Sequence, residues 1–360
     1  RGSFDKYAEG RRGKRGTAEV DAAFLLEIEG WRELLAKHIA QHNPRLTTRQ
    51  LNYAVQQIID RIVFLRICED RGIEPYGRLQ ALQNGGRVYA RLFELFQRAD
   101  DRFNSGIFHF KKETGREEAP DELTPGLRIE DEPLKEIIKH LYYPLSSYEF
   151  SVLPADILGQ VYERFLGKVI RLTASHRAVV EEKPEVKKAG GVYYTPTFVV
   201  DYIVQETVGQ LLEGKTPKNA SKLKALDPAC GSGSFLIGAY QYLLDWHLRW
   251  YITDGAAKHR KEIHEGPGGA WRLTTAERKR ILLNSIFGVD IDAQAVEVTK
   301  LSLLLKVLEG ESSESLQQQF WFFKERALPD LAANIRCGNS LIARDYLLTA
   351  QLDLLDEDSL

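Results

Sequence analysis

The sequence predicts two domains, a helical domain followed by a doubly wound parallel-sheet domain of the α/β class that is incomplete at its C-terminus. The chain has 360 residues, more than one domain usually contains. From residue 20 to about 150 the apolar residues recur at helical spacing, whereas after residue 188 short apolar runs alternate with helical patterns. That alternation is typical of a parallel sheet. We therefore expect a linker or arm at 1–19, a helical domain at 20–180 and the α/β domain at 181–360.

The clearest helix of the first domain is predicted to begin after Thr47, which forms a capping-box pattern with Gln50. Its core-facing stripe runs to Gly72 and consists of Leu51, Val55, Ile58, Ile62, Leu65 and Cys68. The charged residues between these positions are expected to form a solvated face; they include Arg61, Arg66, Glu69 and Asp70. Further helices are predicted at 88–98, 132–142 and 154–167. The whole first half is therefore expected to be helical.

The second domain is predicted from three apolar runs that read as strands. These runs lie at 223–226, 285–289 and 334–337, and each ends near glycine or an acidic residue. A segment rich in glycine and charge interrupts the alternation between Trp246 and Arg272. We interpret that segment as an inserted surface loop.

Composition bounds the function only loosely. The formal net charge of −2 does not by itself argue for nucleic acid, because proteins that bind phosphate backbones usually carry a basic face. Three scattered cysteines are too few for a disulfide framework or a CxxC metal site. The apolar runs are far shorter than the roughly 20 residues that span a bilayer, so we expect a cytoplasmic protein with no membrane partner. A chain that begins at Arg1 and contains no methionine is expected to be part of something larger.

The strongest motif is LDPACGSGSF at 226–235, a strand that leads through a glycine turn into a helix. A phosphate loop of the Walker type is excluded because no Gly-Lys-Ser/Thr follows, and the dinucleotide fingerprint fits poorly because its third glycine would fall at Leu236. An acid at the strand end would repel a pyrophosphate. It suits a cationic ligand instead, such as the sulfonium and ammonium of S-adenosylmethionine.

Two later strand ends add polar groups. Asp290 ends the second predicted strand, where carboxylates commonly bind ribose hydroxyls in nucleoside-binding folds. Asp292 is expected to act instead as the N-cap of the following helix. After the third strand, Asn339 and Ser340 follow a glycine, and an amide or hydroxyl there is placed to meet an adenine, although Gly-Asn is also an ordinary turn.

Together these motifs carry a family resemblance. GGVYYTP at 190–196, DPACGSGSF at 227–235, GVDID at 288–292 and CGNSL at 337–341 resemble the cofactor motifs of gamma-class adenine-N6 DNA methyltransferases. The likeness is to single-chain, type IIG restriction-modification enzymes, whose helical connector also resembles residues 64–72 and 158–172. The resemblance implies a class I methyltransferase (Rossmann-like) domain that binds S-adenosyl-L-methionine. It also implies double-stranded DNA as partner, with nuclease and target-recognition domains in the same chain.

The resemblance also assigns roles by position. Tyr194, Thr195 and Pro196 would close over the cofactor, Asp227 with Gly231 and Gly233 would hold its methionine part, Asp290 its ribose and Asn339 its adenine. The complete set of cofactor-binding candidates is Tyr193, Tyr194, Thr195, Pro196, Asp227, Pro228, Ala229, Cys230, Gly231, Gly233, Phe235, Asp290, Ile291, Asn339 and Ser340.

No catalytic or metal-binding residue is assigned. The family's catalytic Asn-Pro-Pro-Tyr/Phe is absent from these 360 residues, so cofactor binding is expected without methyl transfer by this segment alone. Charged pairs at 182–187 match a nuclease Glu-x-Lys only loosely. Two alternatives stay open: a non-catalytic cofactor-binding or scaffold module, and a methyltransferase that acts on cytosine-N4, RNA or protein.

Overall fold

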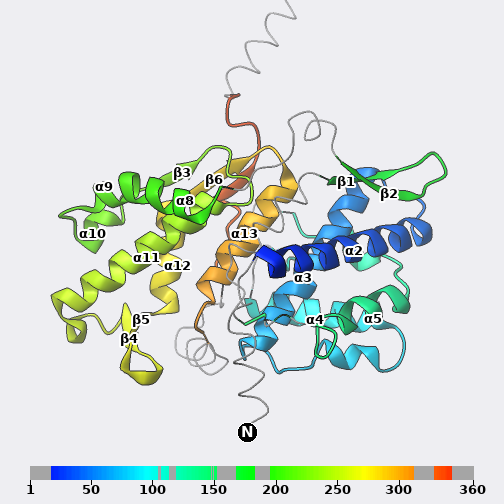
Figure 1. Ribbon diagram of the computed structural model, residues 1–360, viewed down its shortest axis with the longest axis horizontal. Coiled ribbons are helices and arrows are strands. Elements are labelled where there is room, and N and C mark those ends of the chain that lie inside the picture. Colours follow the sequence, from blue (N-terminus) through cyan, green and yellow to red (C-terminus); the bar gives the residue numbers. More distant parts are fainter. Residues whose placement is uncertain are drawn as a thin grey trace, which may run out of the picture. The chain divides into compact units, whose positions relative to one another are not determined.

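The computed structural model describes residues 18–103, 107–112, 119–146, 148, 150–151, 168–182, 195–311 and 328–342. The chain forms two compact units (Figure 1). Unit 1 comprises Arg1–Tyr194 and Lys300–Asp330, and unit 2 comprises Thr195–Thr299 and Leu331–Leu360. The division falls within helix α13 (Ala293–Val307). In the described residues, no helix combines the length and the apolar character needed to cross a membrane.

Unit 1 is built mainly from helices, as the apolar spacing predicts. Its elements are α2 (Ala18–His42), α3 (Thr48–Asp70), η1 (Gln80–Gln83), α4 (Val88–Phe103), η2 (Thr124–Gly126), α5 (Asp131–Lys139), β1 (Lys168–Leu172) and β2 (Ala178–Glu182). The capping box at the start of α3 is confirmed: the Gln50 N–H donates to the Thr47 hydroxyl at 3.2 Å, and the Thr47 N–H donates to Gln50 Oε1 at 2.9 Å. All six residues of the predicted stripe on α3 are buried.

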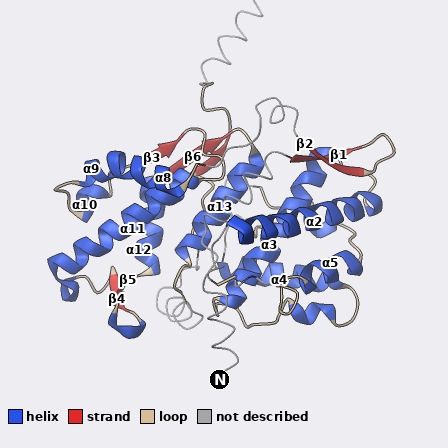
Figure 2. Ribbon diagram, in the orientation of Figure 1, coloured by secondary structure: helices blue, strands red, loops and turns tan. Residues whose placement is uncertain are grey.

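The expectation that the whole first half is helical is wrong. Residues 168–182 form an antiparallel hairpin of β1 and β2 and not a helix (Figure 2). Each strand contains two adjacent β-branched residues, which favour a strand, and β1 packs on α3 while β2 packs on α2. The predicted helix at 154–167 lies outside the described residues.

The charged face expected on α3 is not solvated. Arg61, Arg66 and Glu69 are only 1 to 3% exposed. The Arg61 guanidinium donates to Asp121 Oδ2, to the Thr124 hydroxyl and to the Ile107 carbonyl, each at 2.8 Å. α3 is buried on nearly all sides, so its charges are paired inside the unit instead of facing water.

Unit 2 contains the predicted parallel sheet. Its strands have the order β3-β6-β7, and both neighbouring pairs are parallel, which confirms the three predicted strands and the α/β class. Helix α11 packs on β3, β6, α8 and α12. The elements of unit 2 are α8 (Thr197–Val204), the π-helical turn η3 (Gln205–Gly209), α9 (Gln210–Leu212), α10 (Pro217–Ala220), β3 (Ala225–Asp227), α11 (Ser234–Gly255), η4 (Ala256–Lys258), β4 (Ile263–Glu265), η5 (Pro267–Gly269), β5 (Trp271–Leu273), α12 (Thr275–Ser285), β6 (Ile286–Asp290), the first part of α13 and β7 (Ile335–Cys337).

The segment between Trp246 and Arg272 is more ordered than the inserted loop that the sequence predicts. Helix α11 continues to Gly255, and β4 pairs with β5 in an antiparallel hairpin. The last turns of α11 are stabilised by burial of Tyr251. This residue is 4% exposed, and its hydroxyl donates to Glu277 Oε1 at 2.6 Å.

Candidate cofactor-binding site

Three strand ends meet at one edge of the sheet in unit 2. Asp227 ends β3 and Asp290 ends β6, and because the strands are parallel, their carboxyl ends lie at the same edge. Asp290 is also in register with Cys337, the last residue of β7. The two candidate acids and the loop that carries Asn339 are therefore brought to neighbouring strand ends, as the sequence predicts.

The glycine loop between β3 and α11 depends on left-handed backbone angles. Gly231 has φ +52° and Gly233, at the start of α11, has φ +84°. A Cβ at Gly233 would lie 2.7 Å from Cγ2 of Thr299 on α13. The Thr299 hydroxyl donates to the Gly231 carbonyl at 2.9 Å. Thr299 thus holds the loop from behind, a role that the sequence analysis missed because nothing in the spacing along the chain connects it to the loop.

The loop is also fastened to β6. The Cys230 N–H donates to the Val289 carbonyl at 2.9 Å, and the Gly231 N–H donates to Asp290 Oδ2 at 2.8 Å. A Cβ at Gly288 would lie 2.6 Å from Leu236 Cδ1, so β6, the loop and α11 are closely packed. Cys230 is 6% exposed, and burial together with the nearby acids raises the pKa of its thiol to about 12. The thiol therefore stays protonated and is no nucleophile at neutral pH.

Asp290 contacts the loops that follow β3, β6 and β7, the first two through its carboxylate and the third through its main-chain carbonyl. Besides the bond to Gly231, its Oδ1 accepts the Asp292 N–H at 2.8 Å, and its main-chain carbonyl accepts the Gly338 N–H at 2.9 Å. A carboxylate has about four acceptor positions, so it retains capacity for a ligand. Asp292 Oδ1 accepts the Gln294 N–H at 2.8 Å, which confirms its predicted role at the start of α13.

Asp227 is a half-buried carboxyl near a second acid. Burial raises its pKa, and the negative charge of Asp290 raises it further, while a hydrogen bond from the Ala229 N–H at 3.1 Å acts in the opposite direction. The neighbouring carboxyls of Asp227 and Asp290 create a negative potential at the strand ends, and that potential makes ionisation of Asp227 less favourable. A cation bound there would relieve that cost.

The remaining candidates follow the same strand ends along the chain. Asn339 and Ser340 are exposed, and Asn339 Oδ1 accepts the Leu341 N–H at 2.9 Å, an ordinary turn contact. Ile291, next to Asp290, is 74% exposed, an apolar side chain open to a ligand. Pro228 and Ala229 are exposed and Phe235 is half-buried.

The last group of candidates precedes α8. Thr195 and Pro196 lie at the start of this helix, where the Pro196 carbonyl accepts the Val199 N–H at 2.9 Å. Helix α8 packs closely on α11, since a Cβ at Gly238 would lie 2.6 Å from Val200 Cγ1. Tyr193 and Tyr194 lie outside the described residues.

Most of the segment that carries the site is similar to a known methyltransferase domain. Residues 209–350 match the family model described as MmeI, DNA-methyltransferase domain. The chain is 36% identical over 323 residues to the type II restriction enzyme and methyltransferase RM.Eco57I of Escherichia coli, covering 90% of this chain and 30% of the relative. It is 24% identical over 332 residues to the adenine-specific methyltransferase PglX of Streptomyces coelicolor, covering 87% and 24%.

Among solved structures, the cryo-EM structure of a DrdV–DNA complex matches 91% of this chain and 24% of that chain, at 13% identity and a TM-score of 0.34. The family model and the curated relatives confirm the resemblance that the motifs indicated. The chain spans less than a third of the length of both curated relatives, at 30% and 24%.

Proposed function

We propose that this chain, as a relative of the type II restriction-modification methyltransferases, forms the connector and S-adenosylmethionine-binding part of a DNA adenine-N6 methyltransferase. The observation that carries the proposal is the convergence of Asp227 and Asp290 on one glycine loop at the carboxyl edge of a parallel sheet. In this assignment residues 20–180 are the connector and 181–360 belong to the methyltransferase domain.

Each part of the site suits one part of that cofactor. The negative potential at Asp227 favours the sulfonium and ammonium charges. The remaining acceptor positions of Asp290 suit ribose hydroxyls, and Ile291 and Asn339 offer an apolar contact and a polar group for adenine. The glycines at 231 and 233 allow main-chain groups to approach the ligand closely.

When bound, S-adenosylmethionine supplies a methyl group on a positively charged sulfur. What this chain supplies is binding and orientation, because no Asn-Pro-Pro-aromatic motif occurs in the 360 residues. The exocyclic amine of adenine is a poor nucleophile, and acceptors for its protons and an aromatic partner for a flipped base would have to come from elsewhere. Double-stranded DNA, a nuclease and a target-recognition domain are accordingly proposed for the whole protein.

Titration calorimetry tests the proposal directly. The purified protein is titrated with S-adenosylmethionine, with S-adenosylhomocysteine and with NAD as a control. We expect saturable binding of the first two and none of NAD. Equal binding of NAD would point to a general nucleotide site, and absence of binding by a chain that circular dichroism shows to be folded would favour the scaffold alternative and reject this function.

A further inference from the structure

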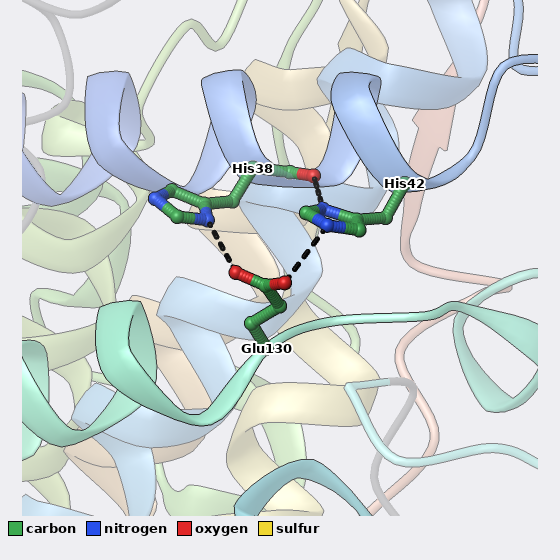
Figure 3. Close-up of side chains that lie close together, drawn as sticks. All are labelled: His38, His42 and Glu130. Carbon is green, nitrogen blue, oxygen red and sulfur yellow. Dashed lines mark hydrogen bonds and ion pairs between the residues drawn. The ribbon is translucent and has the colours of Figure 1, made fainter.

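Three potential metal ligands converge on one side of α2 in unit 1 (Figure 3). His38 and His42 stand four residues apart near the end of α2, so their side chains share one helix face. Glu130 reaches them from the residue before α5. His42 Nε2 lies 3.0 Å from Glu130 Oε1, and His38 Nδ1 lies 3.7 Å from Glu130 Oε2. The three ligand atoms lie within 4.8 Å of one another.

The orientation of His42 is set by the helix itself. Its Nδ1 lies 2.9 Å from the His38 carbonyl. A carbonyl oxygen only accepts, so Nδ1 carries the proton in that contact, and in the neutral ring the Nε2 lone pair is directed at Glu130. A backbone carbonyl that holds one nitrogen of an imidazole while the other faces a metal is the usual arrangement in metal sites.

His38 adds an unsatisfied nitrogen. Its Nδ1 is buried and has no hydrogen-bond partner, although it faces the Glu130 carboxylate. Buried nitrogens of this kind are nearly always paired with a protein group, a water or an ion. Without a metal, one carboxylate can satisfy both rings only if each ring carries a proton on the nitrogen that faces it. A single divalent cation satisfies all three groups with neutral rings.

The carboxylate is held in place by the backbone around it. Asn43, next to His42, accepts the Arg128 N–H at 2.9 Å and donates to the Arg128 carbonyl at 2.9 Å, which fastens the segment before α5 to the end of α2. Glu130 stands at the N-cap position of α5, but its side chain makes no capping hydrogen bond. It is turned toward the histidines instead.

We propose that His38, His42 and Glu130 bind a divalent cation of the zinc class that joins the end of α2 to the start of α5. Two imidazoles and a carboxylate are a donor set that suits Zn²⁺. Ligands about 2.1 Å from a tetrahedral ion lie roughly 3.4 Å apart. The imidazole nitrogens of His42 and His38 lie 3.0 and 3.7 Å from the two carboxylate oxygens of Glu130, and one ligand atom from each residue lies within 4.8 Å of the others, so small side-chain rotations bring the three ligands around one ion. Glu130 is 53% exposed, so the ion can enter from solvent and keep a water as fourth ligand.

A matched control lies in the same unit. His140 stands 3.0 Å from Glu136 and 3.7 Å from Glu27, the same two distances as in the proposed site. Its Nδ1 faces Glu27 and its Nε2 faces Glu136, on opposite sides of the ring. The two carboxylates and the ring therefore cannot all bind the same ion. His140→Ala therefore removes an equivalent set of ion pairs without removing a proposed ligand.

Cobalt absorption provides the test. The chelator-treated protein, carrying Cys337→Ser to remove an exposed thiol, is titrated with Co²⁺ and the bound ion is then displaced by Zn²⁺. We expect one equivalent with visible bands of a site with nitrogen and oxygen ligands. His42→Ala and Glu130→Gln should each weaken Co²⁺ binding by at least about 10-fold, while His140→Ala leaves it unchanged.

Two outcomes would overturn the proposal. One is binding by the parent protein no tighter than by His42→Ala, which would leave the cluster as imidazolium–carboxylate ion pairs. The other is an equal loss in His140→Ala, which would show that the ion responds only to the general charge of the surface. Circular dichroism of Glu130→Gln, whose amide keeps the shape of the carboxyl, verifies that the fold is intact.

Discussion

Replacing Asp290 by Asn separates what its carboxylate does for the fold from what it does for the cofactor. The change keeps the shape and removes one charge. One oxygen remains to accept either the Gly231 or the Asp292 N–H, and the new amide group faces the other donor, with which it cannot bond. Asp292→Asn is the matched control because it removes the same charge two residues away, at a contact that caps α13.

The structure sets the expected sizes. Losing one charge-assisted hydrogen bond inside the protein costs about 1.5 kcal/mol, toward the low end of the usual range because Asp290 is only partly buried. Losing the contact to a ribose hydroxyl should weaken S-adenosylmethionine binding by about 1.5 to 3 kcal/mol, roughly 10- to 150-fold. Asp292→Asn should cost about 0.3 to 1 kcal/mol in stability, because Asn caps a helix as well as Asp does and only the charge at the N-terminus of α13 is lost. It should leave the affinity almost unchanged.

Calorimetry with S-adenosylmethionine and urea unfolding of both variants would measure the two effects side by side. A steep loss of affinity in Asp290→Asn, with little change in Asp292→Asn, is the expected pattern. If both variants lose affinity equally, the effect is one of general charge. If Asp290→Asn binds as tightly as the parent protein while unfolding earlier, Asp290 only fastens the loop and the assignment to the ribose is refuted.

Three further predictions concern the same framework. Because the folded pKa of Asp227 is raised, its contribution to stability is greatest below the ordinary carboxyl pKa and is lost as pH rises through the folded pKa. Asp227→Asn removes this contribution, so in thermal scans from about pH 4 to 7 the melting temperature of the parent relative to the variant should fall, and the variant should bind the cofactor more weakly. Arg61→Met strands a buried carboxylate and should lower the free energy of unfolding by about 3 kcal/mol in urea; a loss under 1 kcal/mol would contradict the pairing. Gly233→Ala should cost more than the roughly 1 to 2 kcal/mol of a left-handed alanine, since its Cβ also meets Thr299, whereas Gly214→Ala, with φ +67° and open space, should cost only that backbone amount.

The parts of the fold that could be predicted are those whose physics is local. The capping box at Thr47 and the apolar stripe after it involve residues within one helix, so the sequence carries the whole signal. The three strands of unit 2 could be found because each is a short apolar run that stops at a polar or glycine residue. The parallel pairing follows from the helices between them.

The candidate site could be predicted in part for the same reason. Asp227 and Asp290 mark strand ends, and parallel strands bring such ends together whatever lies between them in the chain. Thr299 carries no such mark, because it lies within a helix and reaches the glycine loop only through the packing of α13. Its contact is specified by tertiary structure, which spacing along one chain does not reveal.

The misjudged charges on α3 show why burial is harder to predict than helicity. Helical spacing assigns one face to the core and leaves the rest to solvent, and that reasoning holds for a helix packed on one side only. Arg61 and Arg66 are buried because other segments cover the opposite face, and each of those segments brings the acceptors that an arginine needs, among them Asp121 for Arg61 and the Leu141 carbonyl for Arg66. The partner of Arg61 is 60 residues away and that of Arg66 is 75 residues away. Whether a charged residue beside an apolar stripe is buried therefore depends on segments far away in the sequence. Helical spacing alone does not predict it.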